Sequence, residues 1–170
     1  MKIDTTTEQI FLDAHTNHSD AIFRYCFFQV SNREQALDLT QDTFVKTWEY
    51  MAKGGKVDNI KAFLYRIATN AIIDYRRKKK STSLDSMMED GYDVGHDERE
   101  NHEQISDGEL IMKSLANIDE KYREVLSMRY IEDMSITEIA KATGESENNV
   151  SVRIHRGIEK LKNNFESRIN

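Results

Sequence analysis

The chain has 170 residues, of which 38% are hydrophobic and 32% charged, and its formal net charge is −6 at pH 7. No apolar run is long enough to span a membrane, and the N-terminal sequence lacks the apolar stretch of a secretory signal. The single cysteine, Cys26, excludes an intramolecular disulfide and a cysteine-based zinc site. Because there is no proline and there are only seven glycines, we expect an all-α cytoplasmic protein built from long helices.

Three helices are predicted in the N-terminal half, and the first spans about residues 7–30. The polar run Asn17–Ser19 allows a break in this helix. Cys26 lies among apolar neighbours, which indicates a small buried side chain and not a reactive thiol.

The second predicted helix begins after Ser31, which forms a capping box with Glu34, and ends at Gly54–Gly55. Its apolar stripe contains Leu37, Phe44, Val45, Trp48 and Met51. Acidic and amide side chains occupy much of its other side, namely Asp38, Gln41, Asp42 and Glu49. Since charged helix faces are usually solvated, this pattern alone does not establish a binding surface.

The third predicted helix starts with Asp58 as its N-cap and carries an unbroken apolar stripe from Ile60 to Tyr75. Residues 61–80 contain seven cations against one carboxylate. Cations complement the dipole at the C-terminal end of a helix, but a cluster this dense exceeds what capping needs. The basic run therefore indicates contact with phosphates.

Residues 81–107 reverse this charge, with nine carboxylates against one cation and little apolar periodicity. The composition predicts a flexible acidic linker between an N-terminal domain at 1–80 and a C-terminal domain at 108–170. Five side chains of metal-binding types lie close together in this linker: His96, Asp97, Glu98, His102 and Glu103. Their spacing matches no metal-binding helical motif, so we expect neither a metal nor a cofactor.

A helix-turn-helix pattern occupies residues 135–162. Ser135 and Glu138 form a capping box at the start of a short helix. Gly144 stands where this helix ends, because a left-handed C′ position favours a residue without a Cβ. Ser146 then caps a second helix, whose inner face comprises Val150, Ile154, Ile158, Leu161 and Phe165.

The outward face of that second helix carries Asn148, Ser151, Val152, His155 and Arg156. Amides pair with adenine edges and cations with phosphates, so this face suits the major groove of DNA. Two amphipathic helices joined at a glycine also occur in helical proteins that do not bind DNA, and the local pattern leaves both interpretations open.

Three segments occur in a fixed order: ALDLTQDTFVKTWEYM (36–51), KAFLYRIATNAIIDYRRKKK (61–80) and the helix-turn-helix that ends in RIHRGIEKLK (153–162). Together they resemble bacterial sigma factors of the extracytoplasmic-function group of the sigma-70 family. The resemblance covers nearly the whole chain apart from the acidic linker and the extreme ends. It implies an N-terminal domain that docks on the clamp helices of core RNA polymerase and reads the −10 promoter element, and a C-terminal domain that reads the −35 element.

The resemblance also assigns roles to residues of this chain. Those expected to bind core polymerase are Asp38, Gln41, Asp42, Phe44 and Trp48. Those expected at the −10 element are Tyr65, Arg66, Asn70 and Asp74, with Arg76, Arg77 and Lys78 on the DNA backbone. Those expected at the −35 element are Ser146, Asn148, Asn149, Ser151, Val152, Arg153, His155 and Arg156. Many relatives have tryptophan where this chain has Phe63, whose position on the apolar stripe predicts burial.

The partners implied are core polymerase, promoter DNA and, as is common among relatives, a membrane-linked anti-sigma protein. No enzymatic activity is implied. Two other classes remain open from the sequence. A metal-dependent hydrolase would use the linker side chains. A repressor or activator that does not join polymerase would account for the helix-turn-helix, but it leaves the acidic second helix and the basic third helix unexplained.

Overall fold

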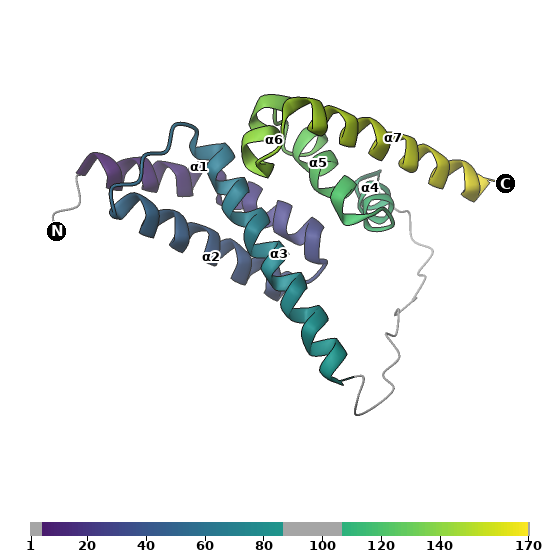
Figure 1. The fold of residues 1–170 in the computed structure, drawn as a ribbon, viewed down its shortest axis with the longest axis horizontal. Coiled ribbons are helices and arrows are strands. Elements are labelled where there is room, and N and C mark those ends of the chain that lie inside the picture. The colour runs from purple at the N-terminus through teal and green to yellow at the C-terminus, as the bar shows by residue number, and fades with distance from the viewer. Residues whose placement is uncertain (1–4, 87–106, 170) are drawn as a thin grey trace.

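The computed structural model describes residues 5–86 and 107–169, and the regular structure in these ranges is α-helical. Seven helices form two groups, α1 to α3 and α4 to α7 (Figure 1). The predicted all-α fold is confirmed. Within the described ranges, no helix combines the length and apolar character needed to cross a membrane.

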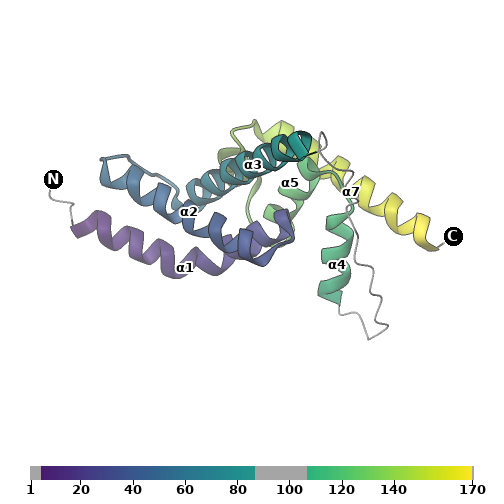
Figure 2. The ribbon, with the colours of Figure 1, turned by 90° about the horizontal axis from the view of Figure 1, so that it is seen from below.

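The N-terminal group consists of α1 (Thr5–Val30), α2 (Arg33–Ala52) and α3 (Ile60–Ser86), and Figure 2 shows α1 and α2 side by side. Its best-buried apolar side chains are Ile22, Tyr25, Cys26, Ala36, Leu64, Tyr65, Ala68 and Ile72. Cys26 is buried as predicted, and burial raises the pKa of its thiol to about 12. The reactive thiolate is therefore scarce at neutral pH.

Two helix ends differ from the prediction. Helix α1 runs without a break through 17–19, where Asn17 is exposed and His18 and Ser19 are half-buried. Helix α2 is capped by Asn32, whose side chain accepts a hydrogen bond from the backbone N–H of Gln35 at 2.9 Å. The predicted cap, Ser31, instead has a left-handed backbone with φ 52° and makes the turn that separates the two helices.

Both ends of α3 also lie further along the chain than predicted. Asn59, and not Asp58, accepts a hydrogen bond from the backbone N–H of Ala62 at 2.9 Å. The helix continues to Ser86, into the segment predicted to be a flexible linker. The remainder of that predicted linker, including the residues 96–103 weighed as metal ligands, lies outside the described residues.

The C-terminal group comprises α4 (Asp107–Ala116), α5 (Glu120–Tyr130), α6 (Ile136–Thr143) and α7 (Glu147–Ile169). Its core is built from side chains with no more than 2% exposure: Val125, Leu126, Met128, Met134, Ile139 and Val150. Phe165, which was predicted to lie on the inner face of α7, is 39% exposed and lines a groove together with Ser114 of α4.

The two groups of helices touch each other. Helix α6 packs along α3, and α1 contacts both α4 and α5. Figures 1 and 2 show the C-terminal group seated against the N-terminal one. No local sequence pattern predicts this contact, because it joins side chains about 70 to 110 positions apart in the chain.

Candidate polymerase and nucleic-acid interfaces

The helix-turn-helix forms as the sequence predicts. The Ser135 side chain accepts from the backbone N–H of Glu138 at 3.1 Å, and the Glu138 carboxylate accepts from the backbone N–H of Ser135 at 2.9 Å. This backbone bond is the main reason why the pKa of Glu138 is lowered. Gly144 ends α6 with φ 72°, and Ser146 accepts from the backbone N–H of Asn149 at 3.2 Å at the start of α7.

Helix α7 has a buried face and a free face. Val150 and Ile154 point into the domain, and Gly157 lies so close to α5 that a Cβ there would meet the Leu126 side chain at 2.9 Å. The predicted −35 residues on the opposite side are exposed, namely Ser146, Asn148, Asn149, Ser151, Val152, His155 and Arg156. The glycine contact holds α7 tightly enough that this polar face projects from the domain as one surface.

Arg153 does not belong to this surface. Its guanidinium donates to the carboxylates of Glu124 and Glu145 and to the backbone carbonyl of Lys121, and its side chain is only 18% exposed. Arg153 was predicted to contact DNA, but in this structure its hydrogen bonds tie α7 to α5 and to the turn before α7. The helix period places Arg153 at the edge of the buried face, where the acidic side chains of α5 and the turn reach it.

Helix α3 presents a second polar face. Arg66, Asn70, Arg77 and Lys78 are exposed, as predicted for the −10 residues. Asp74 is partly buried, and its carboxylate accepts from the Arg77 guanidinium one turn along the helix. Arg66 and Asn70 lie one turn apart, so a cation and an amide point from the same side of α3.

Tyr65 and Arg76 were also expected at the −10 element, but the structure does not place either of them on the exposed face of α3. Tyr65 is fully buried, packs its ring on Tyr25 with 5.2 Å between ring centroids, and donates to Glu132 Oε2 at 3.1 Å. Burial raises the pKa of Tyr65 well above its ordinary value. Arg76 donates to the Gln29 backbone carbonyl at 3.0 Å and lies 3.2 Å from a carboxylate of α5. Both side chains join the two helix groups.

Phe63 is half-buried, with its ring 4.9 Å from the Tyr50 ring, measured between centroids. Its predicted burial is therefore only partial. The Tyr50 ring itself is 45% exposed, so this aromatic pair sits at the rim of the N-terminal core.

Helix α2 carries the predicted polymerase-binding residues in two environments. Asp38, Gln41 and Asp42 are exposed as expected. Phe44 is 5% exposed and belongs to the core of the N-terminal group. Trp48 is half-buried, and its ring lies 5.0 Å from the Phe11 ring of α1.

An apolar groove lies between α1 and α2, beside the exposed acidic residues of α2. Its volume is about 370 Å³, and its lining consists of Glu8, Phe11, Leu12, Phe44, Val45 and Trp48. Val45 and Leu12 are 55% and 50% exposed. Val45 was predicted to belong to the apolar stripe of this helix, but it lies three residues after Asp42 and shares the exposed acidic face.

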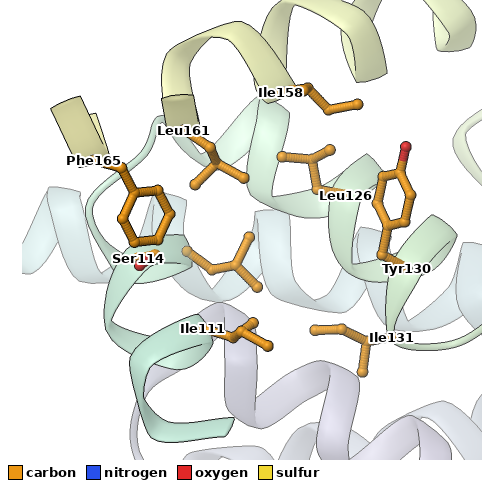
Figure 3. A pocket seen from close by; sticks show the side chains of 9 residues that line it. Ile111, Ser114, Leu126, Tyr130, Ile131, Ile158, Leu161 and Phe165 are labelled. Carbon is orange, nitrogen blue, oxygen red and sulfur yellow. The ribbon is translucent and has the colours of Figure 1, made fainter. Parts of the chain in front are cut away.

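A second apolar groove, of about 170 Å³, opens between α4, α5 and α7 (Figure 3). The side chains around it are Ile111, Ser114, Leu115, Leu126, Tyr130, Ile131, Ile158, Leu161 and Phe165. Tyr130 is 62% and Ile111 52% exposed at its edge. This groove was not predicted from the sequence, because α4 was not among the predicted helices. Among the described residues, no group of three metal-binding side chains is present.

In a comparison with known protein families, each of the two helix groups matches a region of the sigma-70 family. Residues 15–82 match the family described as Sigma-70 region 2, and residues 108–161 match Sigma-70, region 4. The chain is 26% identical over 162 residues to RNA polymerase sigma factor SigV of Bacillus subtilis (strain 168), with 95% of each chain aligned. It is 29% identical to the ECF RNA polymerase sigma factor SigW of the same strain, with 91% of this chain and 88% of that one aligned.

Two solved structures have the same fold. One is the sigma factor RpoE in complex with the anti-sigma factor NepR from Bartonella quintana, with a TM-score of 0.74, 21% identity, and 93% of this chain and 98% of that chain covered. The other is CnrH in complex with the cytosolic domain of CnrY, with a TM-score of 0.68, 23% identity, and coverage of 94% and 90%.

Proposed function

The chain belongs to the extracytoplasmic-function group of the sigma-70 family, and from this premise we propose how its surfaces divide the work of a sigma factor. The protein binds core RNA polymerase and directs transcription initiation at specific promoters. It acts in the cytoplasm as a DNA-binding initiation factor and not as an enzyme. The observation that carries the proposal is the pairing of two family regions, in order, with an exposed polar helix face on each.

The exposed face of α7 reads the −35 element. Asn148 and Ser151 supply hydrogen-bonding groups for base edges, and the Val152 methyls suit contact with a thymine methyl. His155 and Arg156 lie further along the same face, where Arg156 is placed to neutralise a phosphate. The tight packing of α7 on α5 supports this role, because a recognition helix must be held rigidly to discriminate between bases.

The exposed face of α3 reads the −10 element. Asn70 offers an amide that can donate to and accept from an unstacked base, and Arg66 stands one turn before it. Arg77 and Lys78 lie further along the helix, at the start of a basic run that continues through Lys79 and Lys80, where phosphate contacts add affinity without sequence preference. Tyr65 and Arg76 have no part in this surface while the two helix groups are in contact.

Core polymerase docks on α2. The exposed carboxylates of Asp38 and Asp42 flank Gln41 and adjoin the apolar groove that Trp48 and Val45 line. An acidic rim around an apolar centre fits a helical partner with a basic surface, because the rim gives orientation and the buried centre gives affinity.

An anti-sigma protein is a further proposed partner. The groove between α4, α5 and α7 is lined almost entirely by apolar side chains, and several of them are exposed (Figure 3). A groove of this kind fits the apolar face of an amphipathic helix. The two solved structures of the same fold are complexes of two proteins, and one of them pairs a sigma factor with an anti-sigma factor.

Reversing one charge on α2 tests the proposed function. Asp42→Arg should abolish co-purification with core polymerase, since it places a cation against the proposed basic partner. Glu159→Arg is the matched control: it makes the same charge change at an exposed position of α7 and should leave polymerase binding intact. Helical content should be unchanged in both.

If Asp42→Arg bound core polymerase as well as the unchanged chain does, the acidic face of α2 would not be the docking surface. If the unchanged chain bound promoter DNA but not core polymerase, the protein would instead be a free-standing repressor or activator.

A further inference from the structure

A basic pocket lies where α3 passes the end of α1 and the start of α5. Its volume is about 510 Å³, which is larger than either apolar groove and is typical of sites that bind small molecules. Its lining includes four cations, Arg76, Arg77, Lys79 and Lys80, against the single carboxylate of Glu120. The pocket is therefore strongly positive, although the chain as a whole is negative.

Arg76 is the fixed cation of this pocket. Its Nη2 donates to the backbone carbonyl of Gln29 at 3.0 Å and to the side-chain Oε1 of the same residue at 3.1 Å. Its Nε lies 3.2 Å from Glu120 Oε1. Positive charge is still in excess here, since the pKa of Arg123 is lowered by burial and by the nearby charge of Arg76. A concave site with surplus cations attracts an anionic ligand.

Two lysines supply the charge that is available to such a ligand. Lys79 and Lys80 are exposed, and neither belongs to an ion pair among the residues that the structure describes. Arg77 differs from them, because its guanidinium is paired with Asp74. Each lysine ammonium group has three N–H donors and suits the oxygens of a phosphate.

The pocket does not share the side of α3 that carries Asn70. Lys79 follows Asn70 by nine positions, about two and a half turns at 3.6 residues per turn, so the two side chains leave opposite sides of the helix. Arg76 points toward α1 and α5, where its hydrogen bonds lie. DNA bound along the Asn70 side therefore does not account for these cations, whereas a ligand small enough to enter the pocket does.

The other walls of the pocket suit a nucleoside. Tyr75 and Val30 are half-buried and contribute apolar surface, and an aromatic ring is a surface on which a base packs. The Glu120 side chain is 60% exposed, and Arg76 faces its Oε1, so Oε2 can accept a hydrogen bond from a hydroxyl or amino group. An inorganic anion would use neither feature.

We propose that this pocket binds a nucleoside polyphosphate. The phosphates lie on Lys79 and Lys80, the base packs on Tyr75, and Glu120 accepts from the ribose or from the base. The site goes beyond the proposed function and does not rest on it, because binding can be measured without polymerase or promoter DNA.

Calorimetric titration of the purified full chain with ATP tests the site directly. Magnesium is left out so that the phosphates stay free, and about 0.1 M salt limits attraction to charges more than about 10 Å away. We expect one saturable site per chain. Pyrophosphate should bind about tenfold more weakly than ATP because it lacks the nucleoside, and adenosine about a hundredfold more weakly because it lacks the phosphates.

Four variants show which side chains hold the ligand. Lys79→Ala and Lys80→Ala should each weaken ATP binding about tenfold, as expected when one charge-assisted contact is lost. Lys78→Ala is the matched control, since it removes an adjacent exposed cation that does not line the pocket, and it should change ATP affinity by less than about twofold. Tyr75→Leu should weaken ATP binding about fivefold and leave pyrophosphate binding unchanged. Circular dichroism should give the same helical content for all four.

Three results would overturn the proposal. The first is the lack of a saturable site for ATP, or equal affinity for ATP and adenosine. The second is an equal loss of ATP affinity in Lys78→Ala and Lys79→Ala, because it would show general attraction to the basic end of α3 and not a pocket. The third is pyrophosphate binding as tight as that of ATP together with no effect of Tyr75→Leu, which would exclude a nucleotide as the ligand.

Discussion

Helices α3 and α7 both present amide and cationic side chains to solvent, but their surroundings differ. The inner face of α7 packs on α5 and α6 of its own domain, and its outward face is exposed from Ser146 to Arg156 apart from the buried positions. Helix α3 packs on α1 and α2 and is also covered by α6 of the other domain. The comparison shows that the polar face of α7 is free, whereas α3 also carries a contact with the C-terminal domain.

Each helix also contains an arginine that serves structure. Arg153 ties α7 to α5 within one domain, and Arg76 ties α3 to α5 across the two domains. A basic side chain on a DNA-facing helix is thus not sufficient evidence of a phosphate contact. The distinction can be tested by substitutions that separate stability, base preference and salt dependence.

The largest expected effect is on stability. Arg153→Ala should lower the free energy of unfolding by about 2–4 kcal/mol, because it leaves the partly buried carboxylates of Glu124 and Glu145 without their counter-charge. Arg156→Ala, at an exposed position of the same helix, should leave stability unchanged and weaken DNA binding. Urea denaturation of the full chain measures the stability of both variants, and titration with promoter DNA measures their binding. If Arg153→Ala weakened DNA binding and left the free energy of unfolding unchanged, Arg153 would not be a structural residue.

Base preference should divide between the two helices. Asn70→Ala should lose about 1–3 kcal/mol of discrimination at one −10 position, as expected for a lost base contact, and leave the −35 preference unchanged. Asn148→Ala should lose discrimination at one −35 position and leave the −10 preference unchanged. Binding to a panel of single-base promoter variants checks this, and a shift in −35 preference caused by Asn70→Ala would refute the assignment of α3.

Salt dependence should distinguish free cations from paired ones. Lys78→Ala should reduce the slope of log affinity against log salt by about one, equally on every promoter. Arg77→Ala should reduce it less, since the Arg77 guanidinium is already paired with Asp74. Lys53→Ala, at the exposed end of α2, serves as the control and should leave the slope unchanged. Equal slopes for all three variants would show that the basic end of α3 does not contact DNA phosphates.

The smallest effect concerns the cap of α6. The folded-state pKa of Glu138 lies below its ordinary value of 4.5, so its contribution to stability is complete above that value and is lost as the pH falls below it. Glu138→Gln should lower stability by about 0.5–1 kcal/mol at neutral pH and by less in acid. Thermal unfolding at several pH values measures the difference. An equal loss at every pH would show that the carboxylate charge is irrelevant to the cap.

Local chemistry made much of the fold predictable. The capping box at Ser135, the left-handed Gly144 and the cap at Ser146 act between residues three or four positions apart, so their spacing in the sequence is already the evidence. The exposed and buried sides of α7 followed from its 3.6-residue period for the same reason. Errors at Ser31 and Asp58 were of one residue, where a neighbouring asparagine had the better geometry.

The errors with the largest consequences lie where distant segments meet. Tyr65 was expected at the −10 element, but its ring packs on Tyr25 and its hydroxyl donates to Glu132, which lies 67 positions away in the chain. Periodicity tells which residues share a helix face and is silent about whether a second domain rests on that face. For the same reason, neither the ion pair of Arg24 with Glu132 nor the groove of Figure 3 could be predicted from the sequence.

The central claim is that this chain directs core RNA polymerase to promoters through two separate DNA readers. Run-off transcription from a library of randomised promoters, with and without the purified protein, tests it most directly. The account predicts transcripts that depend on the protein and arise from templates sharing two conserved blocks, one near −10 and one near −35. No transcription above that of core polymerase alone, or enrichment of a single block, would contradict it.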